Sequence, residues 1–157
     1  MKRLLILYFL FVISNSFAQL QNEPHPIDIK LEKCHSIDSN QTTLGMKNCE
    51  WVAYGEWEKE IDKYYNLLLD TLSLETSVIL IEAHNNWKIF SENEHEFSRQ
   101  LYYNEMEGTM WHVINASRLK NIVKQRALEL KEYYDTFTFN PYWSLLICAN
   151  LSACVDR

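Results

Sequence analysis

The sequence predicts an all-α protein, a small antiparallel bundle of three main helices that disulfides reinforce. Three long stretches repeat apolar residues at steps of three and four, the period of an amphipathic helix. Only three glycines and three prolines occur in 157 residues, too few for a fold that turns every few residues. One-sided helices cannot bury their apolar faces alone, so we expect the three to pack together.

Residues 1–18 have the three parts of a secretory signal peptide. Lys2 and Arg3 supply the positive start, Leu4 to Ile13 is an unbroken apolar run, and Ser16-Phe17-Ala18 is a small-x-small cleavage site. The run would span about 15 Å as a helix, which is half of a bilayer core. We therefore expect a cleaved signal peptide, a periplasmic or secreted mature chain, and no membrane span after cleavage.

The mature chain is acidic and has the size of one domain. Loss of Lys2 and Arg3 changes the net charge from −6 to −8. Nucleic acid is excluded as a partner, because its phosphates would repel such a surface. The charge favours a cationic protein partner, but it is equally consistent with a surface that only keeps the protein soluble.

Four cysteines, Cys34, Cys49, Cys148 and Cys154, are expected to form disulfides. An even cysteine count in an exported chain favours disulfides over metal ligands, and no CxxC motif occurs. Three pairings are possible. The arrangement that joins close neighbours, Cys34 with Cys49 and Cys148 with Cys154, is the most economical, and the residues alone leave the choice open.

Residues 19–42 are expected to be an extended lead-in, with a short helix around Ile29 to His35. The first long helix is expected to begin near Thr43, a good capping residue. Its opposite, solvated face carries charged residues between Glu58 and Lys63. The predicted buried stripe is Met46, Cys49, Ala53, Trp57, Ile61, Tyr64 and Leu68.

The second helix is expected to begin around Ser73 to Thr76. Its predicted seam is Leu80, Ala83, Trp87, Phe90, Glu94, Phe97 and Leu101. Because Glu94 is charged, we expect the helix to break or become exposed there. Glu107-Gly108-Thr109 is expected to end this region.

The third helix is expected from Met110 to Tyr134, which gives a helical domain over residues 43–134. Its predicted stripe is Ala116, Leu119, Val123, Ala127, Leu130 and Tyr134, and Lys120, Lys124 and Lys131 are expected to face away from it. Residues 135–157 form an irregular or short-helical tail. Its apolar stretch, Trp143 to Cys148, is expected either to pack on the bundle as a short helix or to form a flap.

No motif in the sequence calls for an enzyme. Nucleophile elbows, phosphate-binding glycine loops and HExxH are absent. Two Glu-x-x-His spacings occur, Glu32–His35 and Glu92–His95, but no further glutamates face them from the predicted stripes, so we expect surface residues rather than metal ligands. His84 is expected to be a partly buried structural histidine. We expect no catalytic residue, no metal and no cofactor.

Residues from about Asp28 to Tyr134 follow the order of a known family pattern. Two cysteines with a threonine between them lead into a long helix, and a Leu-x-x-Ala-Gln-x-x-Trp-x-x-Phe-Arg segment follows, with His84 here for Gln and Ser91 for Arg. The matching residues are Cys34, Thr43, Cys49, Ala53, Trp57, Tyr64, Leu80, Ala83, Trp87, Phe90, Gly108, Thr109, Arg126 and Leu130. On these residues the chain resembles the LprI-like family, small exported domains named after a mycobacterial lipoprotein described as a lysozyme inhibitor.

The departures from the family pattern concern disulfides. The family usually has two further cysteines, at the positions of His95 and Arg118, and both are absent here. The resemblance therefore implies that Cys34 pairs with Cys49, and it leaves Cys148 and Cys154, outside the matched region, as a second pair.

The resemblance and the acidic charge together predict an exported, non-enzymatic domain that binds a protein, with a cationic lysozyme as the expected partner. Acidic and aromatic residues near the end of the second helix are the predicted contact surface, although an ordinary solvated turn would have the same composition. These residues are Glu92, Glu94, Glu96, Tyr102, Tyr103, Glu105 and Glu107. The alternative is a structural or stress-related module of the cell envelope whose apolar tail, Tyr142 to Leu151, docks on a larger assembly.

Overall fold

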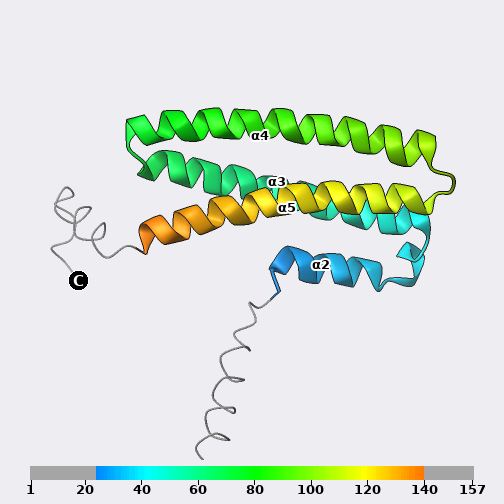
Figure 1. Ribbon diagram of the computed structural model, residues 1–157. Helices are drawn as coiled ribbons and strands as arrows, with labels where there is room; N and C mark the ends of the chain where they lie inside the picture. Colours follow the sequence, from blue (N-terminus) through cyan, green and yellow to red (C-terminus); the bar gives the residue numbers. More distant parts are fainter. Residues whose placement is uncertain (1–23, 140–157) are drawn as a thin grey trace, which may run out of the picture.

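The computed structural model describes residues 24–139, and this part of the chain is an all-α bundle without strands, as predicted. Its helices are α2 (Pro26–His35), α3 (Thr43–Thr71), α4 (Leu74–Gln100) and α5 (Met110–Thr138). Successive helices run in opposite directions, with α3 and α5 together in the middle, α4 along one side and the short α2 along the other (Figure 1). Among residues 24–139, no helix is both long and apolar enough to cross a bilayer.

The lead-in is more ordered than expected, because α2 begins at Pro26 rather than near residue 29. Proline suits the first position of a helix, where its missing N–H costs nothing. His25 caps the helix by accepting a hydrogen bond from the Ile27 backbone N–H at 3.3 Å. Ile27 is buried in the core. A short 3-10 turn, Asp38–Asn40, then leads to α3.

Helices α3 and α5 form the core through the stripes that the sequence predicts. Thr42 caps α3 by accepting a hydrogen bond from the Gly45 backbone N–H at 3.1 Å, so the helix begins at Thr43 as expected. The buried core residues are Ile27, Ala53, Trp57, Ile61, Leu68, Val123, Ala127 and Leu130. Because these apolar side chains recur at helical spacing on both elements, α3 and α5 pack along their length.

The predicted seam of α4 is wrong in part. Phe90 and Phe97 are 51% and 60% exposed, whereas the buried residues of this helix are Ser77, His84 and Ser98. The Ser98 hydroxyl donates to the Asn115 side-chain oxygen, which lets small polar groups serve as the contact between α4 and α5. A seam chosen by hydrophobicity therefore selects a neighbouring face of the helix.

Nor does α4 break at Glu94. The helix continues to Gln100 and then widens into a π-helical turn, Leu101–Glu105. The Glu94 carboxylate accepts a hydrogen bond from the Arg118 guanidinium at 2.7 Å, and this partner on α5 satisfies the charge. The break predicted around residues 107–109 is confirmed, with Gly108 at a φ of 102°.

One of the lysines expected to face away is instead buried. Lys120 is only 7% exposed, and its Nζ lies 2.9 Å from Oε2 of the buried Glu50 on α3. Lys124 is half-buried and lies 2.7 Å from the Asp28 carboxylate. Pairing with carboxylates on other helices explains why these lysines face inward. Helix α5 also continues past Tyr134 to Thr138.

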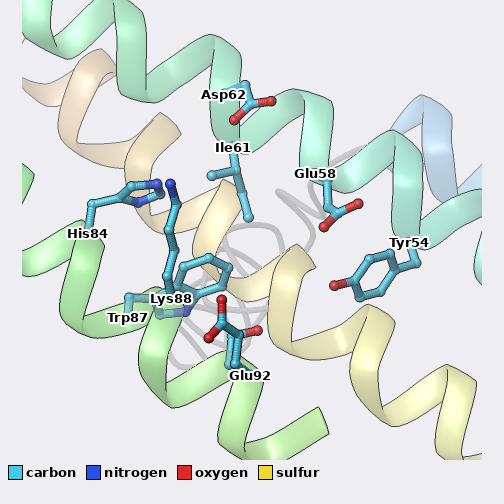
Figure 2. Close-up of a pocket in the computed structure, with 9 residues that line it drawn as sticks. Tyr54, Glu58, Ile61, Asp62, His84, Trp87, Lys88 and Glu92 are labelled. Atoms are coloured by element: carbon cyan, nitrogen blue, oxygen red, sulfur yellow. The ribbon is translucent and has the colours of Figure 1, made fainter.

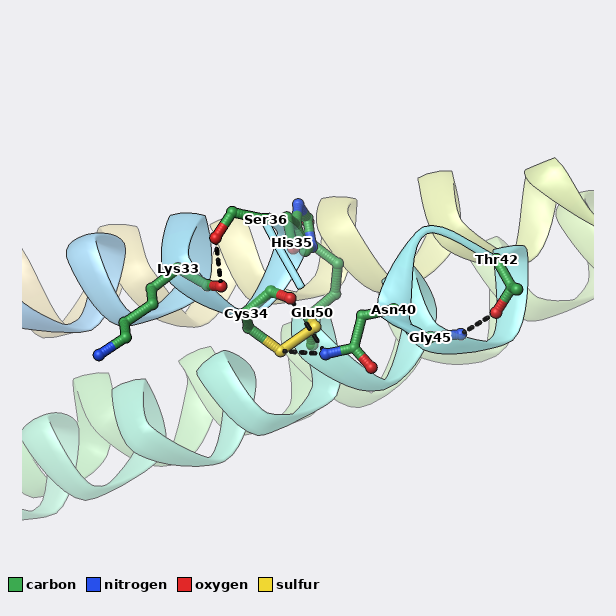
Figure 3. The surroundings of a disulfide bond; sticks show 9 residues. Lys33, Cys34, His35, Ser36, Asn40, Thr42, Gly45 and Glu50 are labelled. Carbon is green, nitrogen blue, oxygen red and sulfur yellow. Dashed lines mark hydrogen bonds and ion pairs between the residues drawn. A yellow bond between two sulfur atoms is a disulfide. The ribbon is translucent and has the colours of Figure 1, made fainter. Parts of the chain in front are cut away.

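The Cys34–Cys49 disulfide joins the end of α2 to the second turn of α3 (Figure 3), with the two Cα atoms 5.8 Å apart. This pairing confirms what the family resemblance implies. Asn40 supports the connection by donating a hydrogen bond from Nδ2 to the Cys34 carbonyl at 3.0 Å. The predicted signal peptide at 1–18, Cys148, Cys154 and the rest of the tail from residue 140 lie outside the described residues.

Candidate functional site

A polar groove of about 480 Å³ lies between α3 and α4 (Figure 2). Along each helix, residues spaced three or four apart face it, which places them on one side of that helix. Helix α3 contributes Tyr54, Glu58, Ile61 and Asp62, and α4 contributes His84, Trp87, Lys88, Ser91 and Glu92. Two charged ridges therefore flank a floor of aromatic and aliphatic groups.

The groove has an excess of negative charge. Glu58, Asp62 and Glu92 bring three carboxylates to its rim, against a single ammonium group from Lys88. Burial raises the pKa of the Tyr54 phenol to about 12, and the adjacent Glu58 carboxylate adds to this rise. Tyr54 stays protonated throughout the physiological range, and its hydroxyl donates a hydrogen bond to the Glu58 carboxylate.

His84 forms the buried end of the groove. Only 3% of it is exposed, and its ring stacks on those of Tyr65 and Trp87 at centroid distances of 4.2 and 5.8 Å. Burial lowers the pKa of the imidazole, and the positive charges of Lys88 and Arg126 lower it further. His84 is thus a neutral aromatic element at pH 7, and its Nδ1 has no hydrogen-bond partner within residues 24–139.

The three carboxylates and the aromatic lining of the groove are chemically suited to a cationic group. Carboxylates on a rim give favourable potential to an arginine or lysine side chain, and aromatic faces beneath them can contact its alkyl or guanidinium part. Within the described part of the chain, no three His, Cys, Asp or Glu side chains gather in a way that could hold a metal ion.

The histidines of the two Glu-x-x-His pairs lie outside the groove. The His35 Nε2 lies 3.5 Å from Oε1 of Glu50, next to the disulfide (Figure 3). The His95 ring lies against Trp51 of α3 at a centroid distance of 5.7 Å. The two histidines therefore contact adjacent residues of α3, and among the described residues neither belongs to a group of side chains that could hold a metal ion.

The predicted contact surface divides between the groove and the far end of α4. Glu92 lines the groove, whereas the six other residues follow it along α4, the π-helical turn and the connection to α5. Glu96 accepts hydrogen bonds from Arg99 and Gln100, which lower its pKa to about 2. The rings of Tyr102 and Tyr103 stack on Trp111 and His112 at 5.9 and 3.9 Å.

Three residues of the predicted surface keep their charge unpaired. Within residues 24–139, no ion pair joins Glu92, Glu105 or Glu107 to another side chain, whereas Glu94 and Glu96 have arginine partners. The groove was not predicted from the sequence, because Glu58 and Asp62 on α3 were expected to belong to an ordinary solvated face of that helix. The only available signal was the four-residue spacing of Tyr54, Glu58 and Asp62 beside the core stripe.

Comparison with solved structures supports the fold. A crystal structure of an uncharacterized protein from Burkholderia thailandensis has a TM-score of 0.70 and 25% sequence identity, over 74% of this chain and 57% of that one. This chain thus matches less than two thirds of that protein's length. Comparison with curated proteins finds no match. The family model described as lysozyme inhibitor LprI matches residues 34–130, from the first disulfide cysteine to the end of the core stripe of α5, and the chain belongs to this family.

Proposed function

We propose that this chain is an exported, non-enzymatic domain that binds a cationic lysozyme and inhibits it. Membership of a family described as lysozyme inhibitors supports this function. The acidic net charge of the mature chain, −8 after removal of the signal peptide, supports a basic partner. Opposite charges raise the rate of encounter and favour one orientation of the complex.

The groove between α3 and α4 is the observation that carries the proposal. In the bound complex, an arginine or lysine side chain of the lysozyme enters between Glu58, Asp62 and Glu92. It approaches the Trp87 ring, over which the chain's own Arg126 guanidinium also lies at 5.8 Å. A charged group in such a partly enclosed site is screened less than one on an open surface. The groove therefore supplies specificity as well as attraction.

The acidic end of the bundle extends the proposed contact surface. Glu105 and Glu107 follow Glu92 along the chain, beyond the groove, and neither has an ion-pair partner among the described residues. Tyr102 and Tyr103, whose rings are held by stacking, are suited to anchor an interface without much loss of side-chain entropy.

A turbidity assay of bacterial cell-wall lysis tests the proposal. The mature chain is added at micromolar concentration to several types of lysozyme, and we expect protection against at least one of them. The triple variant Glu58→Gln, Asp62→Asn, Glu92→Gln is expected to weaken protection by at least about tenfold, since charged interface groups commonly contribute that much.

A matched control separates the groove from net charge. Asp70→Asn, Glu75→Gln, Glu82→Gln changes the charge by the same amount at exposed positions of α3 and α4 that do not line the groove. This control is expected to protect almost as well as the natural chain. Absence of protection against every lysozyme type would overturn the proposal and favour the cell-envelope module. An equal loss of protection in both triple variants would show that the groove is not the contact site.

A further inference from the structure

A second, apolar groove lies at the end of the bundle where α3 meets α4. It has a volume of about 710 Å³, and the side chains around it are mostly apolar, among them Leu72, Ile79, Leu80, Ala83, Tyr133 and Phe137. Ile79 and Tyr133 are 63% and 61% exposed. Contiguous apolar surface of this kind on a small domain usually contacts another group.

The position of the groove follows from how α4 is attached. Polar contacts hold the second half of α4 to α5, namely Glu94 with Arg118 and Ser98 with Asn115. Near the start of α4, Ile79 and Ala83 are exposed and line the groove together with Tyr133 and Phe137 of α5. The groove is therefore a gap in the packing between helices, not a bend within one helix.

The end of α5 leads directly to this groove. Tyr133, Thr136 and Phe137 in its last turns line the groove, and the helix ends at Thr138. The end of α5 and the connection between α3 and α4 lie at the same end of the bundle (Figure 1). The chain then continues through Pro141, which disfavours further helix at the residue before it.

We propose that the apolar groove is the docking site of the chain's own C-terminal segment, Tyr142–Leu151. This segment carries Trp143, Leu145, Leu146 and Ile147 in close succession. The residues between Phe139 and Trp143 reach roughly 13 Å when extended, which brings the tryptophan to the groove without strain. A tethered segment has an effective concentration on the order of millimolar, so docking needs no second molecule.

The size of the groove also selects a short occupant. Sites of about 300–1,000 Å³ accept a small ligand or a few side chains, not a long helix. A cluster of one tryptophan and two or three aliphatic side chains meets this limit and matches the apolar lining. The proposal is independent of lysozyme binding, which uses the polar groove on the other part of the α3–α4 interface.

Hydrogen–deuterium exchange on the full mature chain tests the docking. We expect the amides of residues 143–147 to exchange at least about tenfold more slowly than in an unstructured peptide of the same sequence. Ala83→Arg places a long charged side chain in the groove at an exposed helical position, and it is expected to abolish this protection. Ile89→Arg, on an exposed face of the same helix away from the groove, is the matched control and should leave it unchanged.

Binding of the apolar dye ANS provides a second readout. Leu145→Ser with Leu146→Ser should free the groove, so the full-length variant is expected to bind more dye than the natural chain. Exchange of residues 143–147 at the rate of the free peptide, or protection that survives Ala83→Arg, would overturn the proposal. Protection that appears only as protein concentration rises would also overturn it and would identify a second copy of the chain as the occupant.

Discussion

The Nζ of Lys120 lies 2.9 Å from Oε2 of Glu50, and both side chains are more than nine-tenths buried. His35 approaches the other oxygen of the same carboxylate at 3.5 Å. The three residues lie on α5, α3 and α2, and His35 and Glu50 directly follow the disulfide cysteines Cys34 and Cys49 in sequence. A buried ion pair of this kind contributes little net stability, because desolvation offsets its attraction, but either charge becomes costly when its partner is removed.

Lys120→Met is therefore expected to destabilise the bundle strongly. It leaves the Glu50 carboxylate buried without its cation, which should cost about 3–5 kcal/mol in the free energy of unfolding. Adding Glu50→Leu removes the unpaired charge, and we expect the double variant to recover most of the loss. Urea denaturation followed by far-ultraviolet circular dichroism measures all three proteins.

The exposed ion pair between Glu94 and Arg118 is the natural comparison. These side chains are 25% and 48% exposed, and exposed pairs contribute no more than about 1 kcal/mol. Arg118→Met is expected to stay within this limit. If Lys120→Met lowered the free energy of unfolding no more than Arg118→Met does, burial of the Lys120–Glu50 pair would not affect stability and the expectation would be wrong.

The Cys34–Cys49 disulfide is expected to contribute about 3 kcal/mol. It closes a loop with a sequence separation of 15 and thereby reduces the conformational freedom of the unfolded chain. Cys34→Ser with Cys49→Ser should lower the midpoint of urea denaturation accordingly. Reductant should destabilise the natural chain but leave this variant nearly unchanged, and Cys148→Ser with Cys154→Ser serves as the matched control.

Sequence periodicity predicts α3 and α5 well, because their buried faces are made of large apolar residues such as Trp57 and Leu130. It fails on α4, where Ser77 and Ser98 are buried and Phe90 and Phe97 are not. Small polar residues give no periodic hydrophobic signal, and only a hydrogen-bond partner on another helix makes their burial favourable.

Long-range charge pairing is equally invisible in the sequence. Lys120 looks like a solvated residue until Glu50, far away along the chain, meets it in the core. The polar groove was not predicted for the same reason, since Glu58 and Asp62 line a groove only when α4 brings Trp87 and Glu92 opposite them. Of the residues predicted for partner contact, only Glu92 belongs to the groove.

His84 is expected to make stability depend on pH. Burial, Lys88 and Arg126 lower its pKa in the folded state, with Asp62 opposing them, whereas an unfolded histidine titrates near 6.5. Below that value the unfolded chain binds more protons than the folded one. The stabilisation from a neutral His84 is thus complete above about pH 6.5 and is lost as the pH falls toward the lower, folded pKa.

The neutral variant His84→Gln isolates this effect. We expect the free energy of unfolding of the natural chain to fall more steeply between pH 7.5 and 5 than that of the variant, measured by urea denaturation at each pH. The remaining histidines are common to both proteins and cancel in the comparison. Parallel pH profiles would show that His84 titrates alike in the folded and unfolded chains.

Salt should distinguish the polar groove from the rest of the acidic surface in lysozyme binding. Screening lengths fall from roughly 30 Å at 0.01 M salt to roughly 8 Å at 0.15 M, so the association rate of the natural chain should drop steeply over this range.

The two charge-matched triple variants carry the same net charge and share the long-range part of this steering. If the groove holds a lysozyme cation, Glu58→Gln, Asp62→Asn, Glu92→Gln should also raise the dissociation rate, as measured by surface plasmon resonance, whereas Asp70→Asn, Glu75→Gln, Glu82→Gln should not. Equal dissociation rates in the two variants would mean that charge attracts the lysozyme but that the groove does not hold it.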